Sequence, residues 1–295
     1  MGIKGDLYKH CPPLDQPLMA SAIPQHFKLE ESLERGMLPL VQHSEDPMGE
    51  LKAYIAGYMQ QTFQMNALIR KIDHFYRFLE AMSFSQSCIL NCNAIARACG
   101  LSNKTVENHI RLLEAKGFSF RLPIFDKNPK RLLSSHDKFY FFDVGAYQAI
   151  KPSDTSFRMQ FGDIHPAEQA LSTLIAQHLR AWLDHSEKKG TLYFWRTKLG
   201  QEVDFVIDGT IGFYAIAIKQ TNAIRAQDLK GLEIFKKDYP DSLALLLYGG
   251  TKQIKINNVL CVSIHDFLLN LKPGKPLLRL VTSRATLGKS DPVDA

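Results

Sequence analysis

A hairpin pattern in residues 201–220 constrains the fold more than any other stretch of this sequence. Side chains alternate between the two faces of a strand, so Glu202 and Asp204 are predicted on one face of the first strand. The other face is predicted to carry the apolar residues Val203, Phe205 and Ile207. Asp208-Gly209 is a strong signal for a tight turn. The stretch therefore predicts two adjoining strands with a pair of acids on one face.

The hairpin places Asp204 near Lys219 at the end of the second strand. This pairing is the nucleus of a metal-dependent nuclease site, in which an acid holds Mg²⁺ and a lysine steadies the attacked phosphate or the water. The scheme also needs an acid two residues before the lysine, and that position holds Ala217. Alanine has no oxygen to offer a hard cation. We therefore expect Mg²⁺ to be held weakly, if at all, by Asp204 and Glu168.

Glu168 belongs to a helix predicted from about Pro166 to His185. Its spacing to the apolar positions of that helix, Leu171, Ile175 and Trp182, predicts an inward position in the first turn. A buried carboxylate needs a partner, and the candidates are Lys219 and a metal ion shared with Asp204. The alternative is a glutamate that reaches solvent at the helix start, stabilised by the helix dipole.

The pattern around this helix and hairpin is that of a compact α/β domain over residues 160–272. We predict strands at 191–197, 201–207, 213–219, 243–248 and 259–263, with helices at 225–238 and 265–271. Residues 146–165 are predicted to be a linker, and residues 273–295 a flexible tail. Residues 1–46, which hold five prolines, are predicted to be an irregular arm with a short helical piece at 27–40.

Residues 47–150 are predicted to form a helical and winged-helix domain. Two short helices, 91–99 and 103–116, are separated by a turn, with Ser102 as the N-cap and Gly117 after the second helix. Val106, Ile110 and Leu113 form the apolar face of the second helix. Its opposite face carries Lys104, Asn108 and Arg111, where a recognition helix meets DNA.

Two strand-like runs follow, FSFRLPIF and KFYFFDVG, and the connection between them would be the wing. The basic residues expected near a duplex on this side are Arg121, Lys127, Lys130, Arg131 and Lys138. Basic wings contact phosphates and position a protein on DNA. The alternative is a helical interaction domain that never meets DNA, because this fold often serves in protein–protein contacts.

Several runs resemble the C-terminal half of a large family of uncharacterised prokaryotic AAA-type ATPases. They are SLERGMLP, ALIRKIDHFYRFLE, IARACGLSNKTVENHIRLLE, KFYFFDVG, YFWRTKLGQEVDFVID and DLKGLEIF. The resemblance covers roughly residues 15–272 and implies a winged helix followed by a nuclease-like domain of the PD-(D/E)XK type. It also implies vestigial catalytic roles for Glu168, Asp204 and Lys219.

Two departures from that family shape the expected function. Members usually begin with an ATP-binding domain that carries a phosphate loop, and the one Gly-Lys-Ser here, residues 288–290, lacks the glycine that the loop motif requires. We therefore expect no ATP binding by this chain itself, which would be a remnant, a separately encoded subunit or a truncated piece. Members also usually carry an acid at the position of Ala217. Glu202 matches a glutamate of members that keep that acid, so it is no special replacement.

The chain has 295 residues, a net charge of +6, scattered cysteines and no apolar run of membrane-spanning length. These properties predict a cytoplasmic protein without a membrane partner, and the mild basicity permits an anionic one. The leading expectation is a nucleic-acid-binding or regulatory module whose nuclease-like domain is inactive. The alternatives are a weak Mg²⁺-dependent phosphodiesterase of DNA or RNA, and an interaction subunit that docks on an ATPase partner or on a second copy.

Overall fold

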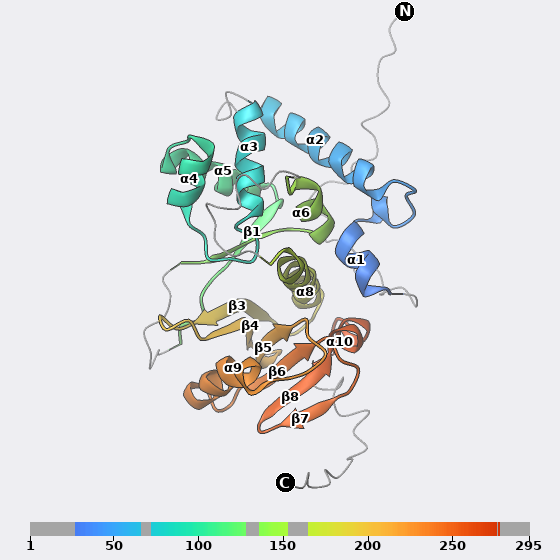
Figure 1. Cartoon of the computed structure of the whole chain (residues 1–295), viewed down its shortest axis with the longest axis vertical. Helices are drawn as coiled ribbons and strands as arrows, with labels where there is room; N and C mark the ends of the chain where they lie inside the picture. Colours follow the sequence, from blue (N-terminus) through green and yellow to red (C-terminus); the bar gives the residue numbers. More distant parts are fainter. Residues whose placement is uncertain (1–26, 66–71, 128–135, 153–164, 276, 278–295) are drawn as a thin grey trace, which may run out of the picture.

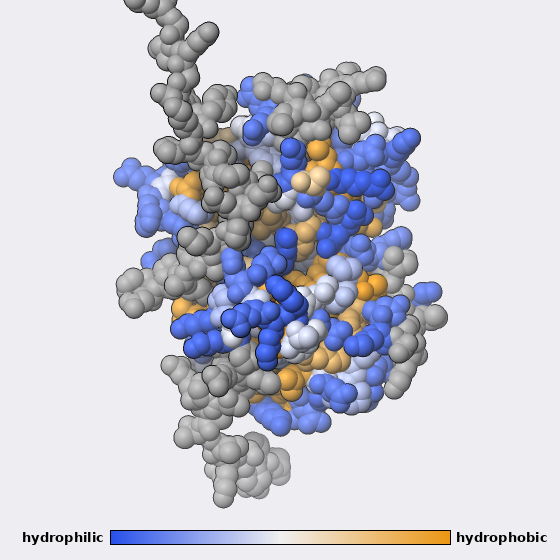
Figure 2. Space-filling model, turned by 180° about the vertical axis from the view of Figure 1, so that it is seen from behind, coloured by the Kyte–Doolittle hydropathy of each residue, from blue (hydrophilic) through white to orange (hydrophobic). Residues whose placement is uncertain are grey.

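The computed structural model describes residues 27–65, 72–127, 136–152, 165–275 and 277. Helices come first along the chain and a six-stranded mixed sheet follows, so the predicted α+β class is confirmed (Figure 1). Seen from behind, hydrophilic side chains cover much of the described surface, with apolar ones showing between them (Figure 2). In the described part of the chain, helices of the length and apolarity needed to cross a bilayer do not occur.

The N-terminal half is helical up to a small hairpin. Its elements are α1 (Leu29–Arg35), the 3-10 helix η1 (Pro39–Val41), α2 (Pro47–Met65), α3 (Ile72–Ser83), α4 (Cys92–Cys99) and α5 (Asn103–Ala115). The two short helices predicted from the sequence are confirmed as α4 and α5. The Asn91 side chain accepts the Ala94 N–H at 3.0 Å, and the Ser102 hydroxyl accepts the Thr105 N–H at 3.1 Å. These side chains satisfy amide groups that the first helical turn leaves unpaired.

Strands β1 (Ser119–Leu122) and β2 (Lys138–Phe141) pair antiparallel. The connection between them includes residues 128–135, which lie outside the described part of the chain, and with them Lys130 and Arg131. Strand β2 also forms isolated bridges from Phe139 to Gln86 and from Lys138 to Ile89. The hairpin is thus tied to the segment that follows α3.

Helix α6 (Val144–Ile150) corrects the prediction of a linker that begins at residue 146. The Asp143 carboxylate accepts the Ala146 N–H at 3.0 Å and so starts the helix directly after β2. Tyr147 and Ile150 are buried. The apolar face of α6 is therefore part of the core. Residues 153–164 of the predicted linker lie outside the described residues.

Two glycines allow the end of α1 to touch the start of α6. A Cβ added at Gly145 would lie 2.2 Å from the Arg35 carbonyl oxygen, and Gly36 has a φ of +77°, which favours glycine. The Met37 N–H donates to the Asp143 carboxylate at 2.8 Å. Two of the runs quoted above, SLERGMLP and KFYFFDVG, are thereby in direct contact. Gly36 and Gly145, one in each run, are required for this close contact.

Helix α8 (Pro166–Asp184) lies between the N-terminal helices and the sheet (Figure 1). Its buried polar side chains bind the N-terminal half: Gln86 donates to Thr173 at 2.6 Å, and the Tyr147 hydroxyl donates to Gln169 at 2.9 Å. One continuous hydrophobic cluster, the α8 cluster, includes Phe139 of the hairpin as well as residues of α8 and of the sheet. The two halves therefore share a core.

The sheet has the order β3-β4-β5-β6-β8-β7. Its strands are β3 (Gly190–Arg196), β4 (Glu202–Gly209), β5 (Gly212–Lys219), β6 (Leu243–Tyr248), β7 (Ile254–Ile256) and β8 (Val259–Ser263). The β3–β4–β5 meander is antiparallel, whereas β5, β6 and β8 run parallel. The five predicted strands are confirmed, and the short β7 was not predicted. Helices α8 and α10 (Ile264–Asn270) contribute to the α8 cluster, while α9 (Ala226–Asp238) covers the other face with a second cluster, the α9 cluster.

A segment of the N-terminal half extends the sheet at its β3 edge. The Phe194 N–H donates to the Pro123 carbonyl at 3.0 Å, and the Phe125 N–H donates to the Phe194 carbonyl at 2.6 Å. Phe125 is 3% exposed and belongs to the α9 cluster. The chain that leaves β1 thus pairs with the C-terminal sheet before it returns to β2.

A bulge interrupts the pairing of β3 with β4. Tyr193 faces Val206, but Trp195 faces Val203, so three steps along β4 oppose two steps along β3. An extra residue of this kind re-aims the side chains on either side of it. The bulge lies in β4 around Asp204.

The bulge overturns one prediction about the faces of this strand. Val203 was expected to share a face with Phe205 and Ile207, yet Val203 packs in the α9 cluster while the other two pack in the α8 cluster. Simple alternation cannot hold across an inserted residue. The antiparallel pairing of the two strands is confirmed, but Asp208 and Gly209 still belong to β4, and the turn lies two residues later, at Thr210 and Ile211.

Candidate functional site

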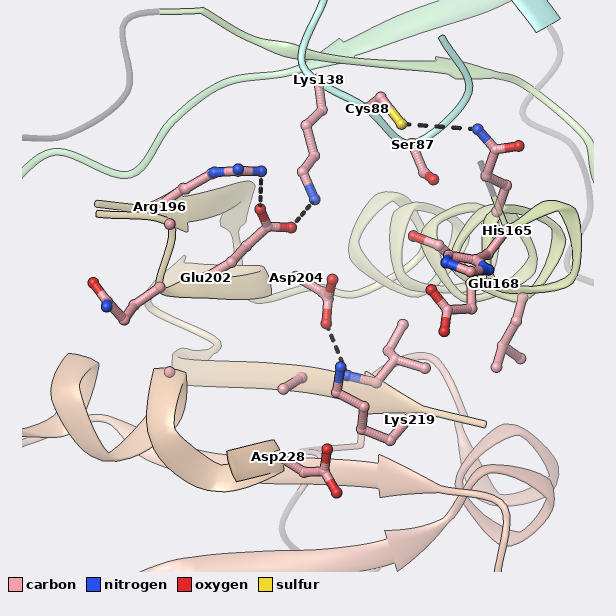
Figure 3. Close-up of a pocket in the computed structure, with 18 of the residues that line it drawn as sticks. Ser87, Cys88, Lys138, His165, Glu168, Arg196, Glu202, Asp204, Lys219 and Asp228 are labelled. Carbon is pink, nitrogen blue, oxygen red and sulfur yellow. Dashed lines mark hydrogen bonds and ion pairs between the residues drawn. The ribbon is translucent and has the colours of Figure 1, made fainter. Parts of the chain in front are cut away.

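A cavity of about 600 Å³ opens where the N-terminal half meets the start of α8, the first residues of β4 and the last residues of β5 (Figure 3). The three residues predicted as a vestigial catalytic set, Glu168, Asp204 and Lys219, all line it. They come from α8, β4 and β5, in the order that the sequence predicted. The start of α9 and the loop at 87–89 complete the wall.

Asp204 lies at the bulge of β4, and its carboxylate accepts the backbone N–H of Ile218 at 2.9 Å. This bond holds the carboxylate over the end of β5. The position lies beyond the last direct pair of β4 with β5, which is Phe205 with Ile216. Burial raises the pKa of Asp204, and the charge of Glu202 adds to this, while Lys138 opposes it. One carboxylate oxygen is therefore committed to the backbone of the neighbouring strand.

Glu202 binds two cations, and we call Lys138, Glu202 and Arg196 the charge lock. One Glu202 carboxylate oxygen accepts the Lys138 ammonium, and the other accepts the Arg196 guanidinium at 2.9 Å (Figure 3). Burial opposes ionisation, yet the two cations hold the pKa of Glu202 below its usual range. Burial likewise disfavours the Lys138 charge, but Glu202 raises the pKa of Lys138 above its usual value. Lys138 and Glu202 are thus both charged at neutral pH.

Lys138 corrects a prediction made from its position near the wing. Its side chain is 5% exposed and points into the cavity, with the ammonium 5.2 Å from the centre of the Phe194 ring. It is therefore unavailable to a phosphate on the protein surface. Lys127, which was expected beside it, is exposed and pairs with Asp208 at 3.2 Å.

Glu168 corrects the prediction of an inward side chain. Residue 168 is exposed, and the buried face of α8 begins at Gln169. Helix α8 starts beyond the edge of the core, so its first turn reaches the open side of the cavity, and Figure 3 shows Glu168 facing that space. Lys219 is also exposed. The solvent-reaching alternative for Glu168 describes the structure, although the side chain still lines the site.

The side chains present do not fit a resident Mg²⁺ ion. Mg²⁺ requires near-octahedral oxygen ligands, yet both Glu202 oxygens bind cations and one Asp204 oxygen binds a backbone amide. Ala217 is buried and contributes to the α9 cluster. Groups of three or more His, Cys, Asp or Glu side chains arranged to share a metal ion do not occur among the described residues.

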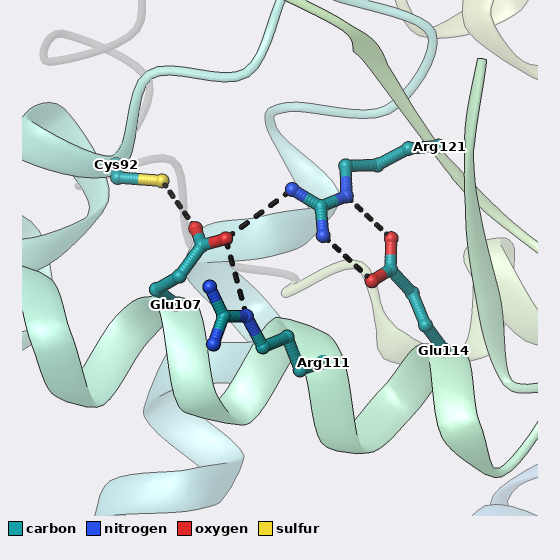
Figure 4. A network of polar contacts seen from close by, with 5 residues as sticks. All are labelled: Cys92, Glu107, Arg111, Glu114 and Arg121. Carbon is teal, nitrogen blue, oxygen red and sulfur yellow. Dashed lines mark hydrogen bonds and ion pairs between the residues drawn. The ribbon is translucent and has the colours of Figure 1, made fainter. Parts of the chain in front are cut away.

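The face of α5 that was predicted to meet DNA carries a polar network (Figure 4). Arg121 binds Glu114 through two hydrogen bonds, at 2.6 and 2.9 Å, and Glu107 at 3.3 Å. The Glu114 carboxylate, aided by Glu107, raises the pKa of Arg121 against the effect of partial burial. Arg121 would have to leave two carboxylates to bind a phosphate, which corrects its prediction as a nucleic-acid contact.

The other candidates on α5 are open to solvent. Lys104 and Arg111 are exposed and Asn108 is half-buried. Arg111 approaches Glu107 only at 3.7 Å, with two thirds of its side chain exposed, which makes this a weak surface pair. Lys104 and Arg111 are therefore the cations of this helix that a phosphate can reach without a large rearrangement.

Sequence reasoning missed the roles of Lys138 and Arg196. A signal was present for Lys138, because it opens the run KFYFF, in which the four residues after it are aromatic. A lysine at the start of such a buried strand needs an acid as its partner. The sequence alone did not reveal which acid, since Glu202 is 64 residues away.

Comparison with known proteins finds two family models, each of which matches a part of the chain. The family model of a domain of unknown function (DUF4143) matches residues 168–267, and that of a second domain of unknown function (DUF8612) matches residues 26–156. DUF4143 is known in proteins associated with AAA ATPases. No curated protein and no solved structure matches the chain at a significant level. The two matched regions follow one another along the chain, and the cavity is lined by residues of both.

Proposed function

We propose that this chain is a non-catalytic nucleic-acid-binding module. The observation that carries the proposal is the exposed face of α5, which presents Lys104, Asn108 and Arg111 on the second helix of a helix–turn–helix pair. The β1–β2 hairpin after that pair supports a winged-helix assignment for this region. Binding would rest on phosphate contacts, which position a protein on a duplex.

The C-terminal half would be a PD-(D/E)XK nuclease-like domain without catalysis. The succession of α8, the β3–β4–β5 meander, α9 and the parallel strand β6 supports the assignment, as does the gathering of Glu168, Asp204 and Lys219 at one cavity. The absence of catalysis is supported by Ala217 and by the charge lock, which uses both oxygens of Glu202. The occurrence of DUF4143 in AAA-ATPase-associated proteins supports a regulatory role beside such an ATPase.

Fluorescence anisotropy with labelled duplex DNA tests the binding proposal. We expect binding that weakens steeply with salt, with a slope of log affinity against log salt of about −0.9 for each phosphate contacted. Lys104→Ala and Arg111→Ala should each weaken binding and reduce the salt slope by about 1. Lys255→Ala, which removes an exposed lysine on β7, is the matched control and should leave binding unchanged.

Arg121→Ala separates the α5 proposal from a general charge effect. It removes one positive charge, as the other three variants do, but from a side chain already bound by Glu114 and Glu107. We expect it to leave the salt slope unchanged. A well-folded chain that does not bind duplex DNA even at low salt would overturn the proposal, as would equal losses from all four variants.

A second candidate is a metal-dependent phosphodiesterase, favoured by the single observation that three of its four expected site residues line one cavity. Incubation of DNA and RNA with the chain and Mg²⁺ or Mn²⁺ tests it. We expect no cleavage above the level of an Asp204→Ala variant. Cleavage that requires Asp204 would replace the non-catalytic proposal by the enzymatic one.

A further inference from the structure

Two carboxylates face the same cavity from one strand. Glu202 and Asp204 are separated by a single residue in β4, and both line the cavity. Two neighbouring carboxylates in a partly buried site repel each other, so both are ionised only where a positive charge lies beside them. In a nuclease of the resembled type that charge would be a divalent metal ion. Here a different cation lies beside them.

That cation is the Lys138 ammonium, which arrives from β2 in the other half of the chain. It binds Glu202 directly, acts electrostatically on Asp204 and is almost fully shielded from solvent. Its three N–H donors suit carboxylate oxygens, and its single charge is held by a strand that is itself bonded to residues Gln86 and Ile89. The ammonium is therefore fixed in place by the fold.

A divalent ion and the charge lock exclude each other by geometry and by charge. To bind Glu202 through one oxygen, a metal would have to displace Lys138 or Arg196 from that oxygen, and to bind through both oxygens it would have to displace both cations. Lys138 would then remain as a buried cation next to a dication, without a partner among the carboxylates. The loss of an acid at Ala217 makes the competing metal site poorer still, because each missing oxygen ligand weakens the hold on a hard cation.

We propose that the Lys138 ammonium is the resident cation of the Glu202–Asp204 pair, occupying the place of a divalent metal ion and fastening the N-terminal half to the sheet. The inference does not depend on whether the chain binds nucleic acid. It predicts that the wild-type cavity rejects divalent cations. It also predicts that removal of the lysine charge exposes a carboxylate pair able to bind one.

The decisive variant is Lys138→Met, which keeps an unbranched side chain of nearly the same length and removes its charge. Thermal unfolding with and without millimolar Mn²⁺, together with Mn²⁺ titration followed by electron paramagnetic resonance, gives the readout. We expect the variant to unfold roughly 10 °C below the wild type in metal-free buffer. Mn²⁺ should restore several degrees to the variant and none to the wild type, because only a ligand that binds the folded state stabilises it.

Two control variants assign the effect. Adding Asp204→Asn to Lys138→Met should abolish Mn²⁺ binding, whereas Lys188→Met, at an exposed lysine, should behave as the wild type. Lys138→Arg keeps the charge and should still exclude Mn²⁺. If Lys138→Met does not fold in metal-free buffer, its recovery on refolding with Mn²⁺ supports the proposal and its failure to recover overturns it. Mn²⁺ binding by the wild type that is lost in Asp204→Asn also overturns it, as does a folded Lys138→Met that binds no Mn²⁺.

Discussion

Replacement of Phe125 by alanine should test whether the two halves of this chain fold as one unit. Phe125 is 3% exposed and comes from the segment that pairs with β3. Its ring contacts four aromatic rings of the C-terminal half at centroid distances of 5.2 to 5.8 Å, those of Tyr193, Phe213, Phe235 and Tyr239. The ring is thus an anchor of one half inside the core of the other.

The expected loss of unfolding free energy in Phe125→Ala follows from these contacts of the Phe125 ring. Burial of a phenylalanine side chain contributes about 1.5–3 kcal/mol, and aromatic pairs add about 0.5–1.5 kcal/mol beyond the buried area. Truncation to alanine also leaves a cavity, and such substitutions cost about 3–5 kcal/mol. With four ring neighbours we expect Phe125→Ala to lower the free energy of unfolding by about 4 kcal/mol. Phe125→Leu, which retains most of the volume, should lose about 1.5 kcal/mol or less.

Urea unfolding followed by circular dichroism measures the loss, and amide hydrogen exchange locates it. The Phe194 N–H donates to the Pro123 carbonyl, so its exchange should accelerate in Phe125→Ala more than that of the Leu246 N–H in the centre of the sheet. A loss below about 1 kcal/mol would refute the reasoning. So would full protection of the Phe194 amide in the alanine variant.

Two further changes test the packing of the N-terminal half. Gly145→Ala should lower the free energy of unfolding by about 2–3 kcal/mol, because the new Cβ would lie 2.2 Å from the Arg35 carbonyl oxygen; a urea midpoint equal to that of the wild type would contradict this. His109 is buried between the rings of Phe75 and Phe78, and burial lowers the pKa of His109. The contribution of neutral, buried His109 to the free energy of unfolding is complete above the unfolded-state pKa of about 6.5 and is lost as pH falls below that value. His109→Leu should therefore flatten the decline in the free energy of unfolding between about pH 7.5 and 5.5. Identical slopes in the variant and the wild type would contradict this.

The local elements could be predicted because their signals lie within a few residues. Ser102 and Gly117 mark the ends of α5, and the alternation of polar and apolar residues marks β4 and β5. Helix α6 was missed although Asp143 caps it, because the aromatic strand before it reads as one continuous run with the helix. Asp143 caps the start of α6 with its side chain, as Asn91 and Ser102 cap the starts of α4 and α5.

The side-chain contacts of the site could not be predicted, because they depend on pairings between distant parts of the chain. Helical periodicity placed Glu168 inward, but where the core ends is set by the sheet beneath the helix. The bulge at Asp204 exists only in the pairing of β4 with β3. The partner of Glu202 comes from β2, on the far side of α8 in the sequence. The sequence thus predicted that Glu168, Asp204 and Lys219 lie close together, but not the ionic partners of Glu202.

The segment at 123–125 also decides how this protein can be divided. In the whole chain its backbone occupies the outer edge of β3 near Phe194. A fragment that begins at residue 160 would leave that edge bare, with a row of amide and carbonyl groups ready to accept a strand from another molecule. Such a fragment would associate edge to edge and precipitate. A soluble C-terminal piece would need the Pro123–Phe125 strand supplied again, as a fused extension or as an added peptide.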